Sequence, residues 1–354
     1  MKRIGIMTFH YAHNYGAMLQ AYALCTYINK KDSCKTEIVD YRINQVWQSY
    51  SMDFSNLDIL HRIFRTIVHR KRKKQATLFE NFMSEYLKLS NKIEKDDLKK
   101  IQQLYDLIIV GSDQVWNTKI IGNDTSYFLD FCTNNEMKAG YAISIGTSYC
   151  TDEFKDAYSK YGVNFKYNSV REGKTSELIR DIFNRDIQVV TDPVFLLERK
   201  AWETLEKKPV GIDEHNKFML FYSLNKNEDL IEYAKKIQER ENCKVYSIHP
   251  LCVVRDKTFK NLRNVGPREF IWLIHNAVCV CTDSFHATAF SVIFRKKACI
   301  LLKGELTGRI CDLLDLLDCN YEDKEFDFSN QNLDFLNKRI EESQEYLELL
   351  TMKI

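Results

Sequence analysis

The sequence predicts an α/β protein built from two doubly wound, Rossmann-like domains with a cleft between them. Short apolar segments with strand character alternate with segments that carry apolar residues at helical spacing, which is typical of a parallel sheet covered by helices on both faces. The alternating series begins a second time after Asp192-Pro193. A length of 354 residues also suits two domains of ordinary size.

The first domain is expected to span residues 1–193. Its strands are predicted at 2–7, 36–41, 105–110, 138–145, 169–170 and 187–191, with a helix at 15–28. The run that ends at Val110 is short and largely apolar, as buried parallel strands are.

The second domain is expected to span residues 194–330. Its strands are predicted at 218–222, 244–248, 278–282 and 298–302, and its helices at 228–240, 267–276 and 286–294. The remaining residues, 331–354, carry a charged amphipathic pattern over 333–350 and are expected to form a C-terminal helix.

A basic insertion interrupts the first domain at about residues 56–90. Seven Lys and Arg residues lie between Arg62 and Lys74, and no acidic residue lies between Asp58 and Glu80. Apolar residues recur there at helical spacing, so one interpretation is an amphipathic helix on an anionic membrane surface. The alternative is a solvated helix packed on its own domain.

Composition excludes several classes of protein. The 51 basic and 49 acidic residues nearly cancel, so no overall field favours nucleic acid. No apolar run is long enough to cross a bilayer, and the start of the chain does not resemble a signal peptide. The 11 cysteines form no CxxC pair, which favours reduced thiols in a cytoplasmic protein and no metal site.

Ligands of open parallel sheets bind beyond the carboxyl ends of the strands, so the loops after the predicted strands are the candidate sites. The first of these loops leads through Asn14 into the helix that carries Gly16 and Gln20. Its backbone N–H groups could hold an anion or sugar hydroxyls, although a plain strand-to-helix turn explains it as well. It contains neither GxGxxG nor GxxxxGK[ST], so we expect no dinucleotide and no P-loop.

Two further loops carry polar side chains. Ser112, Asp113 and Gln114 follow the strand that ends at Val110, and they are suited to binding carbohydrate or orienting a hydroxyl group. The alternative is a capped helix start, with Ser112 or Asp113 as the N-cap residue. His286 follows the apolar strand 278–282 and begins a helix. An imidazole at that position is a candidate proton donor or acceptor, or a structural histidine.

Basic residues near these loops could bind an anion. Arg171 follows a short strand, Lys303 and Arg309 flank a glycine-containing loop, and His249 ends a strand beside Pro250. Each of the three Lys and Arg side chains could equally be an exposed surface charge.

Seven segments carry a resemblance to a known family, and they follow its order along nearly the whole chain. They are HNYGAMLQAYAL (13–24), IIVGSDQVWN (108–117), AGYAISIG (139–146), SVREGKTSELI (169–179), VVTDPVFLL (189–197), GPREFIWLIHNA (266–277) and TDSFHATAFS (282–291). On these segments the sequence resembles the polysaccharide pyruvyl transferase family. The basic insertion is not part of the match.

The resemblance implies a fold like that of two-domain (GT-B) glycosyltransferases. It also implies transfer of a pyruvyl group from phosphoenolpyruvate to one or two hydroxyls of a sugar, as in polysaccharide biosynthesis, with release of phosphate and without a cofactor. His286 matches the family's histidine and Arg171 the arginine of its VRE-like segment. The first domain would then hold the acceptor and the second domain the donor.

The sequence departs from the family at one informative position. Several members carry an arginine two residues before the histidine, and Ser284 stands there in this chain. Arg309 or Lys303 would then supply the charge that binds the donor, with His249 nearby.

The remaining roles are assigned to the first domain and to the acceptor. We expect Asp113 to orient or deprotonate the acceptor hydroxyl. The acceptor contacts are expected from Asn14, Gly16, Gln20, Ser112 and Gln114. The acceptor would be a sugar or a lipid-linked oligosaccharide, and the latter would suit a basic segment on a membrane surface. Two other functions stay open: a GT-B glycosyltransferase that uses a nucleotide sugar, and a non-catalytic carbohydrate-binding protein.

Overall fold

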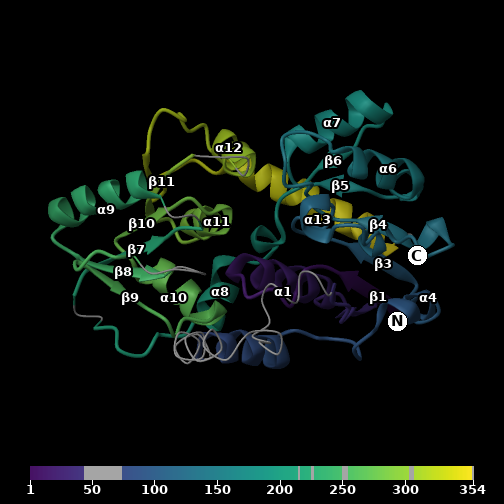
Figure 1. Ribbon diagram of the computed structural model, residues 1–354, viewed down its shortest axis with the longest axis horizontal. Coiled ribbons are helices and arrows are strands. Elements are labelled where there is room, and N and C mark those ends of the chain that lie inside the picture. The colour runs from purple at the N-terminus through teal and green to yellow at the C-terminus, as the bar shows by residue number, and fades with distance from the viewer. Residues whose placement is uncertain (44–73, 214–215, 225–226, 249–253, 303–306, 353–354) are drawn as a thin grey trace, which may run out of the picture.

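The computed structural model describes residues 1–43, 74–213, 216–224, 227–248, 254–302 and 307–352. Two lobes, each built on a parallel sheet, lie on either side of a central group of helices (Figure 1). The predicted fold class, two doubly wound α/β domains, is confirmed.

The first sheet has the strand order β2-β1-β3-β4, and all of its neighbours are parallel. Its strands are β1 (Lys2–Met7), β2 (Cys34–Ile38), β3 (Leu107–Val110) and β4 (Lys138–Gly140). Two short strands, β5 (Ser169–Val170) and β6 (Gln188–Val189), pair with each other beside it. The helices of this lobe are α1 (Tyr15–Asn29), α4 (Leu98–Ile101), α5 (Thr118–Ile121), α6 (Asp152–Lys160) and α7 (Gly173–Phe183).

The second sheet has the strand order β12-β11-β10-β7-β8-β9. Its strands are β7 (Phe218–Tyr222), β8 (Lys244–Ile248), β9 (Phe259–Asn261), β10 (Cys279–Thr282), β11 (Lys297–Ile300) and β12 (Glu325–Asp327). Its helices are α8 (Arg199–Leu205), α9 (Glu228–Glu241), α10 (Pro267–Asn276), α11 (Phe285–Ile293) and α12 (Thr307–Asp315). The edge strand β12 is antiparallel to β11, which the strand-helix alternation did not predict.

Helix α1 joins the two lobes through an apolar contact. The Tyr15 ring stacks on Phe270 of α10 with 4.5 Å between the ring centroids, and the Tyr15 hydroxyl donates to the Val265 carbonyl at 3.1 Å. Eleven of the fifteen residues of α1 are buried, because the helix is covered on several sides. One continuous hydrophobic core therefore extends from the first sheet into the second domain.

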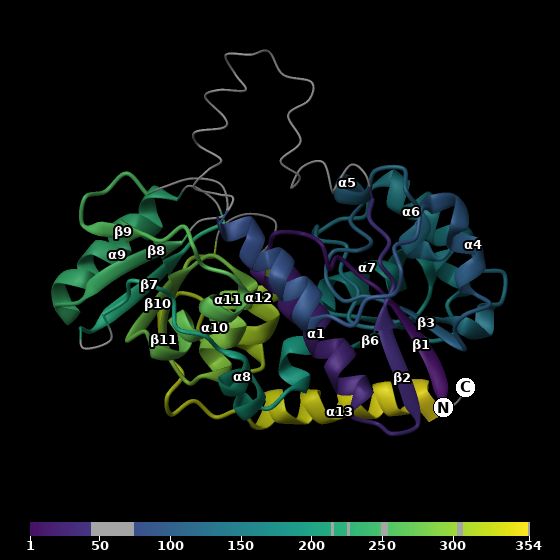
Figure 2. The ribbon, with the colours of Figure 1, turned by 90° about the horizontal axis from the view of Figure 1, so that it is seen from below.

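The predicted C-terminal helix is present as α13 (Asp334–Met352), and it returns to the first domain. Figure 2 shows it running beneath both lobes. The Tyr346 hydroxyl donates to the carbonyl of Gly140 at the end of β4, and the Thr191 amide donates to Ser343 Oγ at 2.9 Å. Helix α13 thus supports the backbone of both β4 and the segment after β6.

The basic segment from Arg62 to Lys74 lies outside the described residues, apart from Lys74. The described part of the insertion contains a helix at 74–86. Its Phe79 ring packs against Tyr15, and Arg268 of the second domain lies over Tyr86, so this helix contacts both α1 and the second domain. None of the described helices is both long and apolar enough to cross a membrane.

Replacing Ser343 by alanine should destabilise the protein by about 1–3 kcal/mol, because the buried Thr191 amide would lose its acceptor. Urea unfolding at pH 7 measures this change in the free energy of unfolding. The exposed Glu345→Ala substitution on the same helix is the control and should change stability by less than about 0.5 kcal/mol. Equal effects of the two substitutions would contradict the importance of this contact.

Candidate active site

The loops that follow β3, β5, β6 and β10 meet between the two domains. Backbone bridges pair Ile143 with Asp113 on one side and with Val170 on the other, so the first sheet continues past its named strands. This extension brings Asp113 and Arg171 next to each other. His286 approaches from the second domain, in the first turn of α11.

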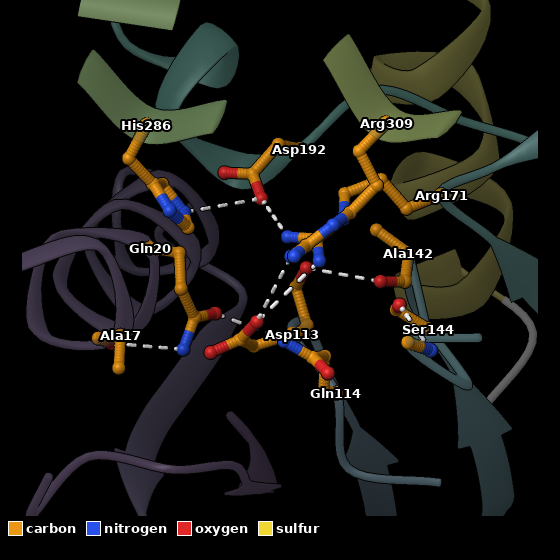
Figure 3. Close-up of polar contacts among 12 residues, drawn as sticks. Ala17, Gln20, Asp113, Gln114, Ala142, Ser144, Arg171, Asp192, His286 and Arg309 are labelled. Atoms are coloured by element: carbon orange, nitrogen blue, oxygen red, sulfur yellow. Dashed lines mark hydrogen bonds and ion pairs between the residues drawn. The ribbon is translucent and has the colours of Figure 1, made fainter. Parts of the chain in front are cut away.

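A chain of charged side chains crosses this junction (Figure 3). Arg171 Nη1 donates to Asp192 Oδ2 at 2.6 Å, and the same oxygen lies 3.5 Å from His286 Nε2. On its other side, Arg171 Nη2 lies 3.4 Å from Asp113 Oδ1. Asp192 therefore links an arginine of the first domain to the histidine of the second domain.

Arg309 lies beside Arg171 above a shared aromatic ring. Its guanidinium is 6.0 Å from the Phe285 ring centroid, and that of Arg171 is 5.1 Å from the same centroid. Arg309 contacts Asp113 and Glu172 only at 3.8 and 3.9 Å, and its Nε is buried without a hydrogen-bond partner. A buried guanidinium with this spare donor is equipped to bind an anion.

The electrostatics of the cluster favour a ligand anion. Burial would by itself raise the pKa of Asp192, but the ion pairs with His286 and Arg171 hold this pKa well below its usual range. Burial and then the neighbouring Arg171 lower the pKa of Arg309, so its positive charge is disfavoured. An anion between the two guanidinium groups would relieve this repulsion.

His286 is held by close packing against the N-terminus of α1. A Cβ atom built on Gly16 would lie 2.0 Å from His286 Nδ1, so no larger side chain than glycine fits without movement. The imidazole is buried, and its Nε2 contacts Asp192 without the geometry of a hydrogen bond. The ring is therefore positioned by shape on one side and by a carboxylate on the other.

Asp113 is aimed at the cluster by a strained loop. Its backbone φ is 73°, in the left-handed region that non-glycine residues rarely adopt. Behind it, Gln20 donates to Thr8 Oγ1 at 2.9 Å and accepts from the Ser112 amide at 3.3 Å, and the Ser112 hydroxyl donates to the Ala142 carbonyl. This buried network fixes the loop.

The residues predicted to contact the acceptor differ in their burial and in their contacts. Gln20 and Ser112 are fully buried behind Asp113 and use their side chains within the protein. Asn14 is the N-cap of α1, where its side chain accepts from the Ala17 amide. Gln114 is half-buried, as Asn14 is, and its side chain accepts from Asn117.

The donor residues predicted from sequence are only partly brought together. Arg171, Arg309 and His286 lie in one cluster, and Ser284 is the buried N-cap residue of α11, beside that cluster. His249 and Lys303 lie outside the described residues. Ser284 carries no charge, and Arg309, which reaches the cluster from α12, contributes a positive charge there.

Three side chains of the cluster are not predicted from the sequence. Asp192 stands out there only as the point after which the alternating series begins again, and Glu172 and Phe285 appear only within segments that resemble the family. A signal was available for Asp192, because a carboxylate directly after a predicted strand lies at the ligand-binding edge of a parallel sheet.

Two cavities open beside the cluster and share Arg309. The larger has a volume of about 670 Å³ and extends from Arg171, Asp192 and Phe285 to α12 and α13, with largely apolar walls. The smaller, of about 210 Å³, lies between Gly146–Ser148, the start of α7 and the start of α12. Among the described residues, no group of three or more His, Cys, Asp or Glu side chains is arranged to hold a metal ion.

The family model for polysaccharide pyruvyl transferase matches residues 14–302. The chain belongs to the polysaccharide pyruvyl transferase family. The match includes every described residue of the charged cluster except Arg309, which lies seven residues beyond its end. No curated protein matches this pyruvyl transferase family member in sequence.

Solved structures match the fold at low sequence identity. UDP-GlcNAc 2-epimerase from Methanocaldococcus jannaschii matches with a TM-score of 0.54 and 12% identity over 99% of this chain and 100% of that chain. The Neisseria meningitidis UDP-GlcNAc 2-epimerase, bound to UDP-GlcNAc, matches with a TM-score of 0.53 and 9% identity over the same shares. These likenesses confirm the GT-B-like architecture of this family member and nothing about its ligands.

Replacing Gly16 by alanine should destabilise the protein by about 1–3 kcal/mol and displace His286, because the new Cβ would overlap the imidazole. Thermal unfolding measures the loss. Gly308→Ala in α12 is the control, since a Cβ there meets nothing within 4 Å, and it should be neutral or stabilising. A stabilised Gly16→Ala protein would contradict the close packing of α1 on His286.

Replacing Asp192 by asparagine should lower the free energy of unfolding at pH 7 by about 3–5 kcal/mol, because Arg171 would stay buried without its main partner. The lowered pKa of Asp192 stabilises the fold fully above the unfolded-state value of about 4, and this stabilisation is lost progressively as pH falls below that value. Urea unfolding at pH 7 and pH 3 should therefore show a smaller loss on acidification for the variant than for wild type. The same loss in both proteins would contradict this assignment.

Proposed function

We propose that this protein transfers a pyruvyl group from phosphoenolpyruvate to two hydroxyls of a sugar, forming a ketal and releasing phosphate, in polysaccharide or glycoconjugate biosynthesis. The sugar would be free or part of a lipid-linked oligosaccharide. The observation that carries the proposal is the pair of buried guanidinium groups of Arg171 and Arg309, next to His286, at the junction of two domains in a member of this family.

The donor explains why such a cluster is needed. Phosphoenolpyruvate carries a phosphate and a carboxylate, and the planar guanidinium groups of Arg171 and Arg309 suit either anion through paired hydrogen bonds. Arg309 has an unused donor at Nε, and its long contacts to Asp113 and Glu172 are easily exchanged for a ligand. Phe285 supplies a flat apolar surface beneath both cations.

His286 is the proposed acid. Carbon 2 of phosphoenolpyruvate becomes electrophilic when its methylene carbon takes a proton, and a positioned imidazole can supply that proton. The Asp192 carboxylate lies 3.5 Å from Nε2 and helps to hold the ring in place. The Gly16 contact on the opposite side prevents the ring from turning away.

Asp113 is the proposed base for the first hydroxyl. It enters the cluster from the first domain, and its loop is fixed by Gln20 and Ser112. Gln114 and the two cavities that share Arg309 give room for the acceptor, the smaller cavity beside Gly146 and the larger beside Asp312. The acceptor would thus approach from the first domain while the second domain supplies the acid.

The proposal is tested by incubating the protein with phosphoenolpyruvate and a panel of soluble oligosaccharides, with phosphate release and product mass as readouts. His286→Gln should lower kcat by about 10²–10⁴-fold, because proton transfer to the donor is lost. Protection of the variant by phosphoenolpyruvate against thermal unfolding should persist, since the two arginines remain.

His275→Gln is the matched control, because that ring pairs with Glu206 on the outer side of α10, and it should leave kcat unchanged. Release of nucleotide from a nucleotide sugar, with no phosphate released from phosphoenolpyruvate, would contradict the proposal in favour of a glycosyltransferase. Binding of sugars with no turnover of either donor would favour a non-catalytic protein.

A further inference from the structure

We propose that Asp312 is a second proton-transfer residue, which takes the proton of the second sugar hydroxyl as the ketal closes. This inference rests on the proposed function and adds to it a residue outside the charged cluster. Asp312 lies on α12, one helical turn after Arg309, so both side chains project from the same face of that helix.

Asp312 lines the larger cavity and is held there by one hydrogen bond. Its Oδ2 accepts from the backbone amide of Gly173, the first residue of α7, at 2.6 Å. This bond crosses from the second domain to the first, beside Glu172 and Arg171. The carboxylate is therefore held in place by one oxygen.

The other carboxylate oxygen is free for chemistry. Among the described residues none donates a hydrogen bond to Asp312 Oδ1, and the side chain lines the cavity that also contains Arg171, Asp192 and Phe285. Asp312 is only half-buried, so a ligand in the cavity can reach it. A fixed carboxylate with one open oxygen is the arrangement that a general base requires.

The second hydroxyl must also lose its proton as the ketal closes, and a second base can take it. In the first step one hydroxyl oxygen bonds to carbon 2, its proton passes to Asp113, and His286 gives a proton to the methylene carbon. In the second step the bond from carbon 2 to the phosphate oxygen breaks and its electron pair leaves with phosphate. The second hydroxyl oxygen then bonds to carbon 2 and its proton passes to Asp312. The two protons taken by Asp113 and Asp312 balance the one that His286 gave to the new methyl group and the one that phosphate takes up to leave as HPO₄²⁻.

The charges around Asp312 suit this role. Burial raises the pKa of Asp312 to about 6, against the opposing effect of the Gly173 amide, and nearby carboxylates add to the rise. These carboxylates are Glu172 and Glu177 from the first domain and Asp315 on α12 itself. The same cavity is also lined by charged groups of both domains and of α13, namely Arg171, Asp192, Arg309, Arg339 and Glu342. The carboxylate form, which accepts a proton, therefore predominates above about pH 6.

The test is Asp312→Asn in the full-length protein, assayed with phosphoenolpyruvate and the soluble oligosaccharide that wild type uses best. Asparagine keeps an oxygen for the Gly173 amide but cannot take a proton. We expect kcat to fall about 10²–10⁴-fold, while thermal protection by phosphoenolpyruvate stays within about threefold in ligand concentration. Wild-type kcat should fall as pH drops through about 6, and this acid limb should be absent in the variant.

Product analysis gives a second readout that a structural role would not produce. Without attack by the second hydroxyl, the intermediate loses a methyl proton and leaves an enolpyruvyl ether, which has the same mass as the ketal. Proton NMR distinguishes the two, because the ether has vinyl signals and the ketal a methyl signal. The residual product of Asp312→Asn should contain the ether, and Asp312→Glu should restore part of the ketal.

Asp318→Asn is the matched control, an exposed carboxylate just beyond α12, and it should behave as wild type. An active wild-type protein with equal kcat and the same acid limb in Asp312→Asn would overturn the inference alone. Loss of phosphoenolpyruvate protection together with activity would overturn it too, in favour of a structural role. A wild-type protein that releases no phosphate from phosphoenolpyruvate would instead refute the proposed function.

Discussion

The carboxylate of Asp192 is the interaction on which the site depends. It contacts Arg171 of the first domain and His286 of the second, and it is fully enclosed by protein. A buried carboxylate is tolerated only with partners of opposite charge, so the two domains are joined by the same group that orients the site. The contacts of Asp192 therefore fix both the positions of the charged groups and the positions of the two domains relative to each other.

Apolar contacts between the two domains support the ion pairs of Asp192. Tyr15 stacks on Phe270 across the domain boundary, and α13 returns to bind the backbone beside Asp192 through Ser343. Such contacts bury apolar surface over a wide area, and this burial helps to offset the cost of removing the charged groups from water. The fold holds its polar centre by enclosing it in a continuous hydrophobic core.

Much of this architecture could be predicted from sequence, because strand-helix alternation is a local pattern. Strands β1, β7 and β8 and helix α10 have the expected bounds, and the loops after strands contain His286, Arg171 and Asp113 as expected. The antiparallel β12 was not predicted, since two of its three residues are exposed and it offers little apolar signal.

The solvent accessibility of the candidate site residues could not be predicted from the sequence. Gln20 lies in a helix directly after a candidate loop, yet it is enclosed, because the helix around it is covered on several sides. Asp312 lies outside the segments that resemble the family, and Asp192 lies within one but has no role assigned from it; their contacts with Gly173 and Arg171 join residues that are distant in sequence and close only in the fold. Pairings of this kind depend on tertiary packing rather than on spacing.

Phe285 and His286 are neighbours in the chain, and this adjacency has a further consequence. The ring of the first lies beneath the two guanidinium groups, and the imidazole of the second faces Asp192. One peptide unit therefore sets the distance between the aromatic ring that carries the two guanidinium groups and the imidazole proposed as the acid. Any rotation of the first turn of α11 would move both side chains together. Substitutions within this family that shift this turn are therefore expected to change the positions of both side chains and not of one alone.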